Sequence, residues 1–253
     1  MTHTLHPEIL AVCRQDRERY LSVLMAPPEH INALMALVAY NQELANAVTG
    51  VSEPMIGQIK LQWWIDAMPS ILSGEPPSHP VAMALSQIGQ GLEVSALQGL
   101  AEARNFDLEA DRPQNLAQLV DYARATGGVL HGLMSDVLGG IPEERSTAHS
   151  VGTAWALIGL MRALPYHSDG RRDMLPQGVT VQEVLKEAQQ HLDQARTVRV
   201  SKRVLSSVII GRLATRHFKR LQRQNWDPAH AEEPPAGVGS VMSLWFGKLS
   251  GRF

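Results

Sequence analysis

Apolar residues recur along most of the chain at intervals of three and four, which is the spacing of one face of an α-helix. Residues 34–44 and 56–67 follow this spacing clearly. Stretches rich in Pro and Gly separate the periodic segments, whereas runs of alternating β-branched residues are nearly missing. The pattern therefore predicts an all-α fold of roughly eight to ten helices.

One segment, residues 151–164, is apolar on nearly all of its faces. Such a segment is typical of a helix surrounded by other helices, and it is too short to span a bilayer. We therefore expect a single large helical bundle over residues 1–227, followed by a Pro/Gly-rich spacer and a short apolar tail over residues 228–253. Thr180 and Glu183 have the spacing of a capping box, which predicts a helix start there.

Composition indicates which kinds of partner and which cellular compartment fit this protein. The 253 residues are 44% hydrophobic and 19% charged, and the net charge of -2 gives no indication of a nucleic-acid partner. The single cysteine, Cys13, has no partner for an internal disulfide, which favours a reducing compartment. Neither a signal peptide nor a long uncharged apolar stretch is present. We expect a cytoplasmic protein that does not span the membrane.

The C-terminal quarter has the strongest charge asymmetry in the chain. Residues 194–226 contain no acidic residue, whereas nine basic residues recur along a stretch that we expect to be helical: Arg196, Arg199, Lys202, Arg203, Arg212, Arg216, Lys219, Arg220 and Arg223. They could form a solvated face whose apolar side packs on the bundle, or a surface for anionic lipid or an acidic partner. Residues 241–249 are apolar and aromatic; they could meet the inner face of the cytoplasmic membrane or dock back on the bundle.

An ordered set of motifs resembles the squalene/phytoene synthase family and extends from about Asp16 to Pro176. The motifs are Arg19-Tyr20-Leu21, Ala36-Leu37-Val38-Ala39-Tyr40-Asn41, residues 57–64, Asp121-Tyr122-Ala123 with Thr126-Gly127-Gly128, and residues 152–162. The resemblance implies the isoprenoid (prenyl) synthase bundle and a reaction that condenses prenyl diphosphates. It also implies magnesium ions held by aspartates on two facing helices.

The chain departs from that family at the positions of the metal ligands. The first aspartate cluster should fall near positions 45, 46 and 49, and the second near 163, 166 and 167. The residues there are Ala45, Asn46, Thr49, Ala163, Tyr166 and His167. Magnesium prefers oxygen ligands in octahedral geometry, so neutral side chains and a histidine are poor replacements. We therefore expect no catalytic residues, no metal ligands and no cofactor, with Mg²⁺ required only if the chain is an active transferase.

Other acidic residues could in principle build an improvised metal site. Asp107, Glu109 and Asp111 lie close together in sequence, and Glu43 lies near the lost first cluster. Each also has a structural interpretation, with Asp107 and Asp111 at helix ends and Glu43 facing solvent.

The residues that replace the second cluster resemble one branch of the family in particular. Residues 162–167, the pair Arg171-Arg172 and Leu175-Pro176 are similar to the branch that includes the mitochondrial assembly factor 6 of respiratory complex I. This resemblance implies a non-catalytic assembly factor or scaffold whose partners are complex I subunits or assembly proteins. The alternatives are an active squalene or phytoene synthase type transferase and a protein that binds a prenyl lipid without turning it over.

Two sets of candidate site residues follow from the family alignment. A vestigial pocket would be lined by Tyr40, Asn41, Gln42, Asn46, Tyr122, Arg162 and His167. The retained cations Arg162, Arg171 and Arg172 could hold an anion, because guanidinium groups bind phosphate and carboxylate bidentately. Equally, they could pair with local acids such as Asp169 and Asp173. The adjacent Trp63 and Trp64 should point to different sides of one helix, with at least one of them in the core.

Overall fold

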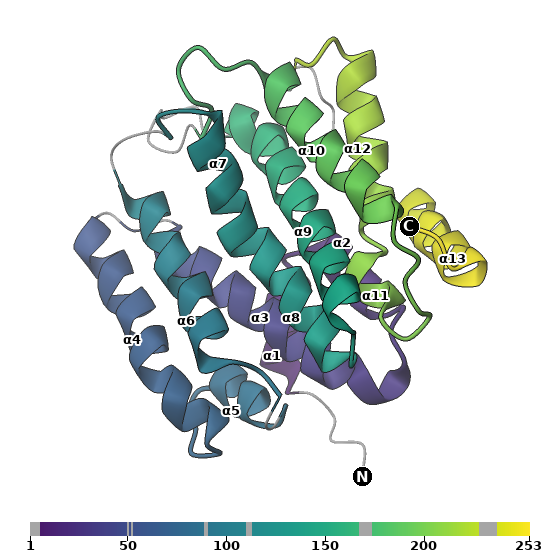
Figure 1. The fold of residues 1–253 in the computed structure, drawn as a ribbon. Coiled ribbons are helices and arrows are strands. Elements are labelled where there is room, and N and C mark those ends of the chain that lie inside the picture. The colour runs from purple at the N-terminus through teal and green to yellow at the C-terminus, as the bar shows by residue number, and fades with distance from the viewer. Residues whose placement is uncertain are drawn as a thin grey trace.

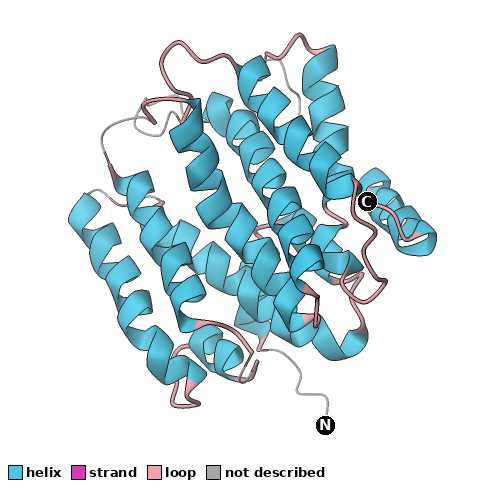
Figure 2. Ribbon diagram, viewed as in Figure 1, coloured by secondary structure: helices cyan, strands magenta, loops and turns pink. Residues whose placement is uncertain are grey.

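The computed structural model describes residues 6–49, 51, 53–88, 91–109, 113–166, 174–227 and 237–253, and this part of the chain is helical with no β-strand (Figure 2). Its α-helices are α1 (Pro7–Cys13), α2 (Arg17–Val23), α3 (Ile31–Val48), α4 (Pro54–Leu72), α5 (Pro80–Ser86), α6 (Val94–Ala103), α7 (Leu116–Ala123), α8 (Val129–Val137), α9 (Pro142–Ala163), α10 (Val181–Arg196), α11 (Leu205–Val208), α12 (Gly211–Arg223) and α13 (Val238–Ser250). The all-α prediction is confirmed. More helices form than the predicted eight to ten, because short helices such as α1, α5 and α11 carry too few residues for a periodic pattern.

Helix α9 lies in the middle of the bundle and packs against α7, α8, α10 and α12 (Figure 1). It begins at Pro142, nine positions before the segment that the sequence marked as central. Its side chains at Val151, Ala154, Leu157, Ile158 and Met161 are fully buried. The predicted central helix is therefore confirmed, and its burial follows from helices on several of its sides.

Two backbones touch where α9 crosses the segment between α7 and α8. That segment, Arg124–Gly128, is a single turn of π-helix. A Cβ atom built at Gly152 of α9 would lie 2.1 Å from the carbonyl oxygen of Gly127, and one built at Gly127 would lie 2.5 Å from that of Gly152. Only glycine permits this approach, so the Gly127 and Gly152 pair sets the spacing of α9 from the π-helical turn.

Local sequence signals account for several helix starts. Proline occupies the first turn of α1, α4, α5 and α9, where its missing N–H has no helical partner to lose. At α10 the Thr180 hydroxyl accepts from the backbone N–H of Glu183, and the Glu183 carboxylate accepts from the backbone N–H of Thr180 at 2.8 Å. The predicted capping box is confirmed.

The predicted basic C-terminal helix is confirmed for α12, whereas the basic residues between α10 and α11 are not helical. The chain leaves helical geometry after α10, and the backbone N–H of Ser201 donates instead to the Glu144 carboxylate of α9 at 2.7 Å. Helices α11 and α12 follow. Their apolar side is buried as expected, with Val204, Leu205, Val208, Ile209 and Leu213 all in the core.

The C-terminal residues 237–253 form a helix docked on the bundle. Helix α13 contacts α12 and α2 and lies at the edge of the molecule in Figure 1. Leu244 is fully buried, and the ring of Phe253 lies against Gly211 at the start of α12. The predicted spacer, residues 228–236, lies outside the described residues. Within the described part of the chain, every helix is too short or too polar to cross a bilayer.

Candidate functional site

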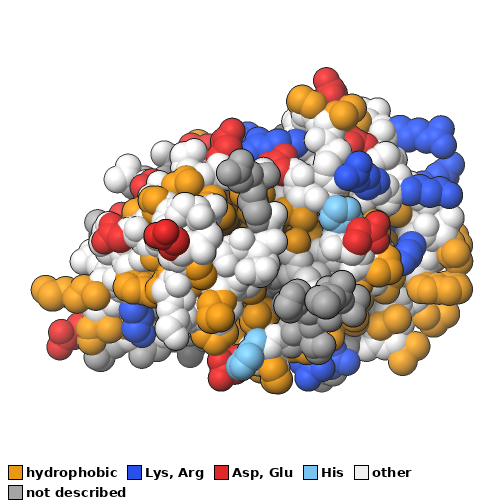
Figure 3. All heavy atoms as spheres, turned by 90° about the horizontal axis from the view of Figure 1, so that it is seen from below, with side chains coloured by type: hydrophobic (Ala, Val, Ile, Leu, Met, Phe, Trp, Pro, Cys, Tyr) orange, Lys and Arg blue, Asp and Glu red, His pale blue; other side chains and the backbone are white. Residues whose placement is uncertain are grey.

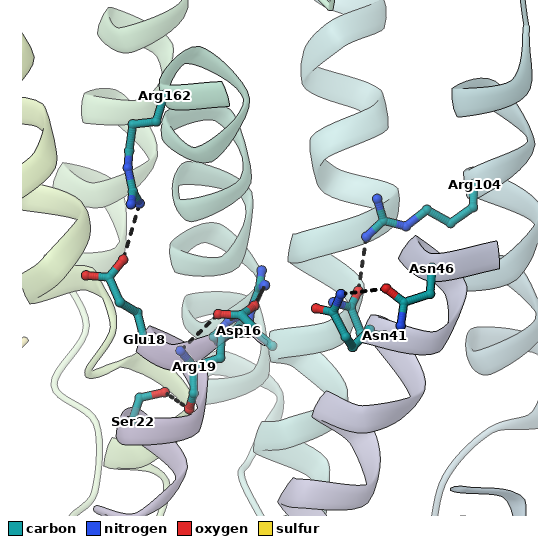
Figure 4. A network of polar contacts seen from close by, with 10 residues as sticks. Asp16, Glu18, Arg19, Ser22, Asn41, Asn46, Arg104 and Arg162 are labelled. Atoms are coloured by element: carbon teal, nitrogen blue, oxygen red, sulfur yellow. Dashed lines mark hydrogen bonds and ion pairs between the residues drawn. The ribbon is translucent and has the colours of Figure 1, made fainter. Parts of the chain in front are cut away.

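A buried polar cluster joins α3, α7 and the 3-10 turn Arg104–Leu108 that follows α6. Arg104 donates to the Asn41 side-chain oxygen at 3.2 Å and to the Tyr122 hydroxyl at 2.8 Å. The Tyr122 hydroxyl donates to both Asp107 carboxylate oxygens at 2.8 and 2.9 Å, and Arg104 pairs with Asp107 at 3.3 Å. We call these four residues, Asn41, Arg104, Asp107 and Tyr122, the Arg104 cluster (Figure 4 shows its Asn41 and Arg104).

Charge is balanced inside the Arg104 cluster. Burial raises the pKa of Tyr122 above its ordinary value, so the phenol stays neutral and donates its proton to Asp107. Burial by itself would lower the pKa of Arg104, but the neighbouring Tyr122 and Asp107 oxygens raise it overall. The guanidinium therefore keeps its charge, and the Asp107 carboxylate is committed to Tyr122 and Arg104. Such an internally satisfied group is a structural tie between helices rather than an open ligand site.

The positions of the lost first aspartate cluster lie one to two turns further along α3. The amide of Gln42 donates to the side-chain oxygen of Asn46 at 3.0 Å, and the Thr49 hydroxyl donates to the carbonyl of Ala45 at 2.8 Å. These groups satisfy one another along the helix. The side chains present do not fit magnesium, since they offer no carboxylate, and in the described segments no three His, Cys, Asp or Glu residues are grouped to hold a metal ion.

A second polar cluster links the short helix α2 to α9 and α12. The Glu18 carboxylate accepts from Arg162 of α9 at 3.3 Å and lies 3.0 Å from the Nε2 atom of His217 of α12. The guanidinium of Arg162 also lies over the ring of Trp155, 5.6 Å from its centroid. Burial would raise the pKa of Glu18, but the hydrogen bonds and charges of His217 and Arg162 outweigh it and lower this pKa. Glu18 therefore stays ionised as the acceptor between two helices.

Arg19, next to Glu18, reaches the other side of α2. It pairs with Asp16, which also accepts from the backbone N–H of Arg19 and so caps α2. The Nε atom of Arg19 lies 3.3 Å from Nε2 of His131 on α8, and Nδ1 of His131 lies 2.7 Å from the carbonyl of Ser207. This arrangement requires the neutral ring that carries its proton on Nδ1. Burial and the charge of Arg19 lower the pKa of His131 to about 3, in agreement with a neutral ring.

The structure brings together only part of the predicted pocket. Asn41 and Tyr122 meet through Arg104, whereas Arg162 belongs to the Glu18 cluster, which lies apart from them in Figure 4. Tyr40 is fully buried and donates its hydroxyl proton to the carbonyl of Leu97 at 2.8 Å. Gln42 and Asn46 bond to each other. The remaining candidates lie outside the described residues: His167, Arg171 and Arg172, with the acids Asp111, Asp169 and Asp173.

The sequence did not predict several of the residues that hold these polar clusters together. Their partners lie far away along the chain: Arg104 bonds Asn41 across 63 positions and Glu18 meets His217 across 199. Asp107 was interpreted as a helix end, and it does lie in the turn after α6, but it also bonds Tyr122. The expected split of the adjacent tryptophans is confirmed, because Trp64 is buried and Trp63 is 40% exposed.

Removing the Tyr122 hydroxyl tests whether the Arg104 cluster is a structural tie. The change Tyr122→Phe leaves the Asp107 carboxylate without its phenol donor in a partly buried site. We expect the free energy of unfolding to fall by about 2 kcal/mol, the usual range for a hydrogen bond to a charged group. Urea denaturation followed by circular dichroism measures it. The same change at Tyr166, which is 70% exposed, should have no measurable effect; equal stability of both variants would contradict the assignment.

Comparison with known proteins places the chain in a family. The sequence model described as "Squalene/phytoene synthase" matches residues 12–236. The chain belongs to the squalene/phytoene synthase family. A solved dehydrosqualene synthase in complex with ligand has the same fold, with a TM-score of 0.74 over 96% of each chain at 14% sequence identity.

The chain is also similar to animal proteins whose name describes a different role. "NADH dehydrogenase (ubiquinone) complex I, assembly factor 6" of Mus musculus is 33% identical over 173 residues, which cover 67% of this chain and 52% of the relative. The protein of the same name from Bos taurus is 31% identical over 186 residues, covering 70% of this chain and 56% of the relative. The chain thus spans about half the length of these curated relatives.

Proposed function

We propose that this squalene/phytoene synthase family member is a non-catalytic assembly factor or scaffold for respiratory complex I. The observation that carries the proposal is the sequence identity of 31–33% to complex I assembly factor 6 over about two thirds of the chain. Its partners would be complex I subunits or other assembly proteins. A prenyl lipid and an anionic membrane surface at the basic C-terminal segment remain proposed contacts of the same protein.

The chemistry of the retained residues supports a role without prenyl transfer. Ionising an allylic diphosphate creates a strongly negative leaving group, which needs concentrated positive charge to stabilise it. Ala45, Asn46 and Thr49 supply no carboxylates that could hold magnesium for this purpose. The cation Arg162 is held by the Glu18 carboxylate at 3.3 Å. The polar groups described here bond mainly to one another, as expected of side chains that hold helices in place.

A deletion strain tests the proposal directly. Deleting the gene that encodes this protein should lower both NADH:ubiquinone oxidoreductase activity and the amount of assembled complex I in membranes. Reintroducing the intact gene should restore both. Reintroduced Tyr166→Phe, an exposed and conservative change, is the control for expression. Normal complex I in the deletion strain would overturn the assembly role.

The transferase alternative is tested on the purified protein. Incubation with farnesyl or geranylgeranyl diphosphate and Mg²⁺ should release no diphosphate, while a squalene synthase in the same assay releases it. Steady turnover would refute the non-catalytic proposal. Retention of a radiolabelled prenyl diphosphate without turnover would instead favour the prenyl-lipid binding alternative.

A further inference from the structure

Helix α13 turns its apolar side outward. The residues that seat it are few: Leu244 is fully buried, and Gly247 lies against Arg212 and Ile209 side-chain atoms. The large apolar residues of α13 follow helical spacing on the side away from this contact, and six of them are exposed: Val238, Val241, Met242, Trp245, Phe246 and Leu249. We call these six the α13 stripe. A helix that exposes an apolar stripe while only Leu244 and Gly247 are buried against the bundle has a surface left to bury.

A basic cavity lies beside the α13 stripe, between α12 and the first turn of α13. Its volume is about 520 Å³. Among the described residues, the charged side chains that line it are cationic apart from Glu18: Arg216, Lys219, Arg220 and Arg223, with His217 beside them. Figure 3 shows apolar side chains gathered at the end of the molecule where α13 lies, with Lys and Arg side chains next to them.

The charge of this cavity is not neutralised from within the described residues. Glu18 is already bound to Arg162 and His217. Arg216 donates to the backbone carbonyl of Gly239, which carries no full charge. Lys219, Arg220 and Arg223 take part in none of the ion pairs within the described segments. Residues 194–226 and 237–253 contain no acidic residue, and the acid that directly follows this basic stretch is Asp227.

We propose that this face docks on an anionic phospholipid bilayer, with lipid phosphates at the α12 cavity and the α13 stripe in the outer acyl region. The surface joins two properties within a few residues: cations that form no ion pair with the described residues, and an outward apolar helix face. A bilayer interface is complementary to both, since anionic headgroups lie directly above hydrocarbon. Arginine binds phosphate oxygens through paired N–H donors, and Trp245 is of the residue type enriched at the boundary between headgroups and acyl chains.

Vesicle sedimentation with the purified protein tests whether the cations of the cavity contribute to membrane binding. We expect binding to vesicles of equal parts phosphatidylglycerol and phosphatidylcholine and little binding to phosphatidylcholine alone. The variant Arg220→Gln with Arg223→Gln should weaken partitioning by about thirty-fold, as two surface cations would. The control Lys60→Gln with Lys186→Gln removes the same charge from exposed positions on α4 and α10. It should bind like the unmodified protein; equal loss in both variants would overturn a localised site.

A second pair of variants tests the α13 stripe. Met242 and Leu249 are 67% and 65% exposed, and Met55 and Ile59 of α4 are a close match at 65% and 63%. Met242→Ser with Leu249→Ser should weaken partitioning on the order of a hundredfold, while Met55→Ser with Ile59→Ser should not. Larger loss from the α4 pair would overturn the proposal.

A third experiment tests whether the basic cavity binds a soluble anion rather than a lipid surface. Calorimetric titration with inorganic phosphate should give weak or no heat, because the proposed ligand is a lipid surface. Phosphate binding that depends on Arg220 and Arg223, with no binding to either vesicle, would overturn the proposal in favour of a soluble anion. No binding in any arm would overturn it in favour of an acidic protein partner. The assay uses the isolated protein, so its outcome is independent of the assembly role.

Discussion

Replacing Gly152 by alanine is expected to lower the free energy of unfolding by about 3 kcal/mol or more. The added Cβ would lie 2.1 Å from the carbonyl oxygen of Gly127 and 2.8 Å from the Cβ of His131. Backbone atoms cannot move aside by a rotamer change, so α9 would have to shift away from the π-helical turn and from α8. Urea denaturation of the purified variant, followed by circular dichroism, measures the loss.

A matched control lies two turns further along the same helix. A Cβ atom built at Gly159 would meet nothing within 4 Å. Because alanine restricts the unfolded chain and favours helix, Gly159→Ala should raise the free energy of unfolding by up to about 1 kcal/mol. If Gly152→Ala lowers the free energy of unfolding and Gly159→Ala raises it, the loss at Gly152 comes from the backbone contact and not from helix propensity. A neutral Gly152→Ala would mean that α9 and the turn are not held at this spacing.

The sequence predicts the class of fold well but does not predict the contact between Gly127 and Gly152. Periodicity marked α9 as a central helix because nearly all of its faces are apolar between residues 151 and 164. Gly127 and Gly152 were both present in recognised motifs, yet nothing in the sequence relates one to the other. Contact between two glycine backbones leaves no side-chain pattern, so a structure is needed to find it.

The candidate site was predicted in part, and the missing part has a physical reason. Asn41 and Tyr122 were placed in one pocket by resemblance, and Arg104 joins them. Arg104 itself is an ordinary helix-end residue in sequence terms, and its role comes from the crossing of α3, α7 and the turn after α6. Tyr40 was placed in the same pocket, but neighbouring residues on a helix point about 100° apart. Its hydroxyl therefore faces Leu97 of α6 while Asn41 faces Arg104.

For the C-terminal segment, the sequence did not predict which side of the helix packs on the bundle. The sequence left two alternatives open for residues 241–249, a membrane contact or docking on the bundle. The structure shows docking on the bundle, because Leu244 is buried, and it leaves Met242 and Trp245 exposed, so the membrane contact stays a prediction. A stretch that is apolar on several sides does not reveal from its sequence which side the bundle covers.

Acid should destabilise this protein through His131. Its pKa in the folded chain is lowered to about 3 from 6.5, first by burial and then by the charge of Arg19. Between pH 6.5 and pH 3, His131 therefore binds a proton in the unfolded chain but stays neutral in the folded chain. The stabilisation is fully present above pH 6.5 and is lost as the pH falls toward 3. The expected slope is about 1.4 kcal/mol of unfolding free energy per pH unit for this group, measured by urea denaturation at several pH values.

The variant His131→Gln assigns that slope to a single side chain. Glutamine offers one acceptor to Arg19 and one donor to the Ser207 carbonyl but does not titrate. Its stability at neutral pH should be lower, while the slope between pH 6.5 and pH 3 should become shallower. Some slope will remain, because burial also lowers the pKa of His149 and His191, and the pKa of Glu18 is lowered by His217 and Arg162 against its burial. If His131→Gln keeps the full slope, the buried ring accepts a proton in the folded state, and the Arg19 to His131 hydrogen bond must open to admit it.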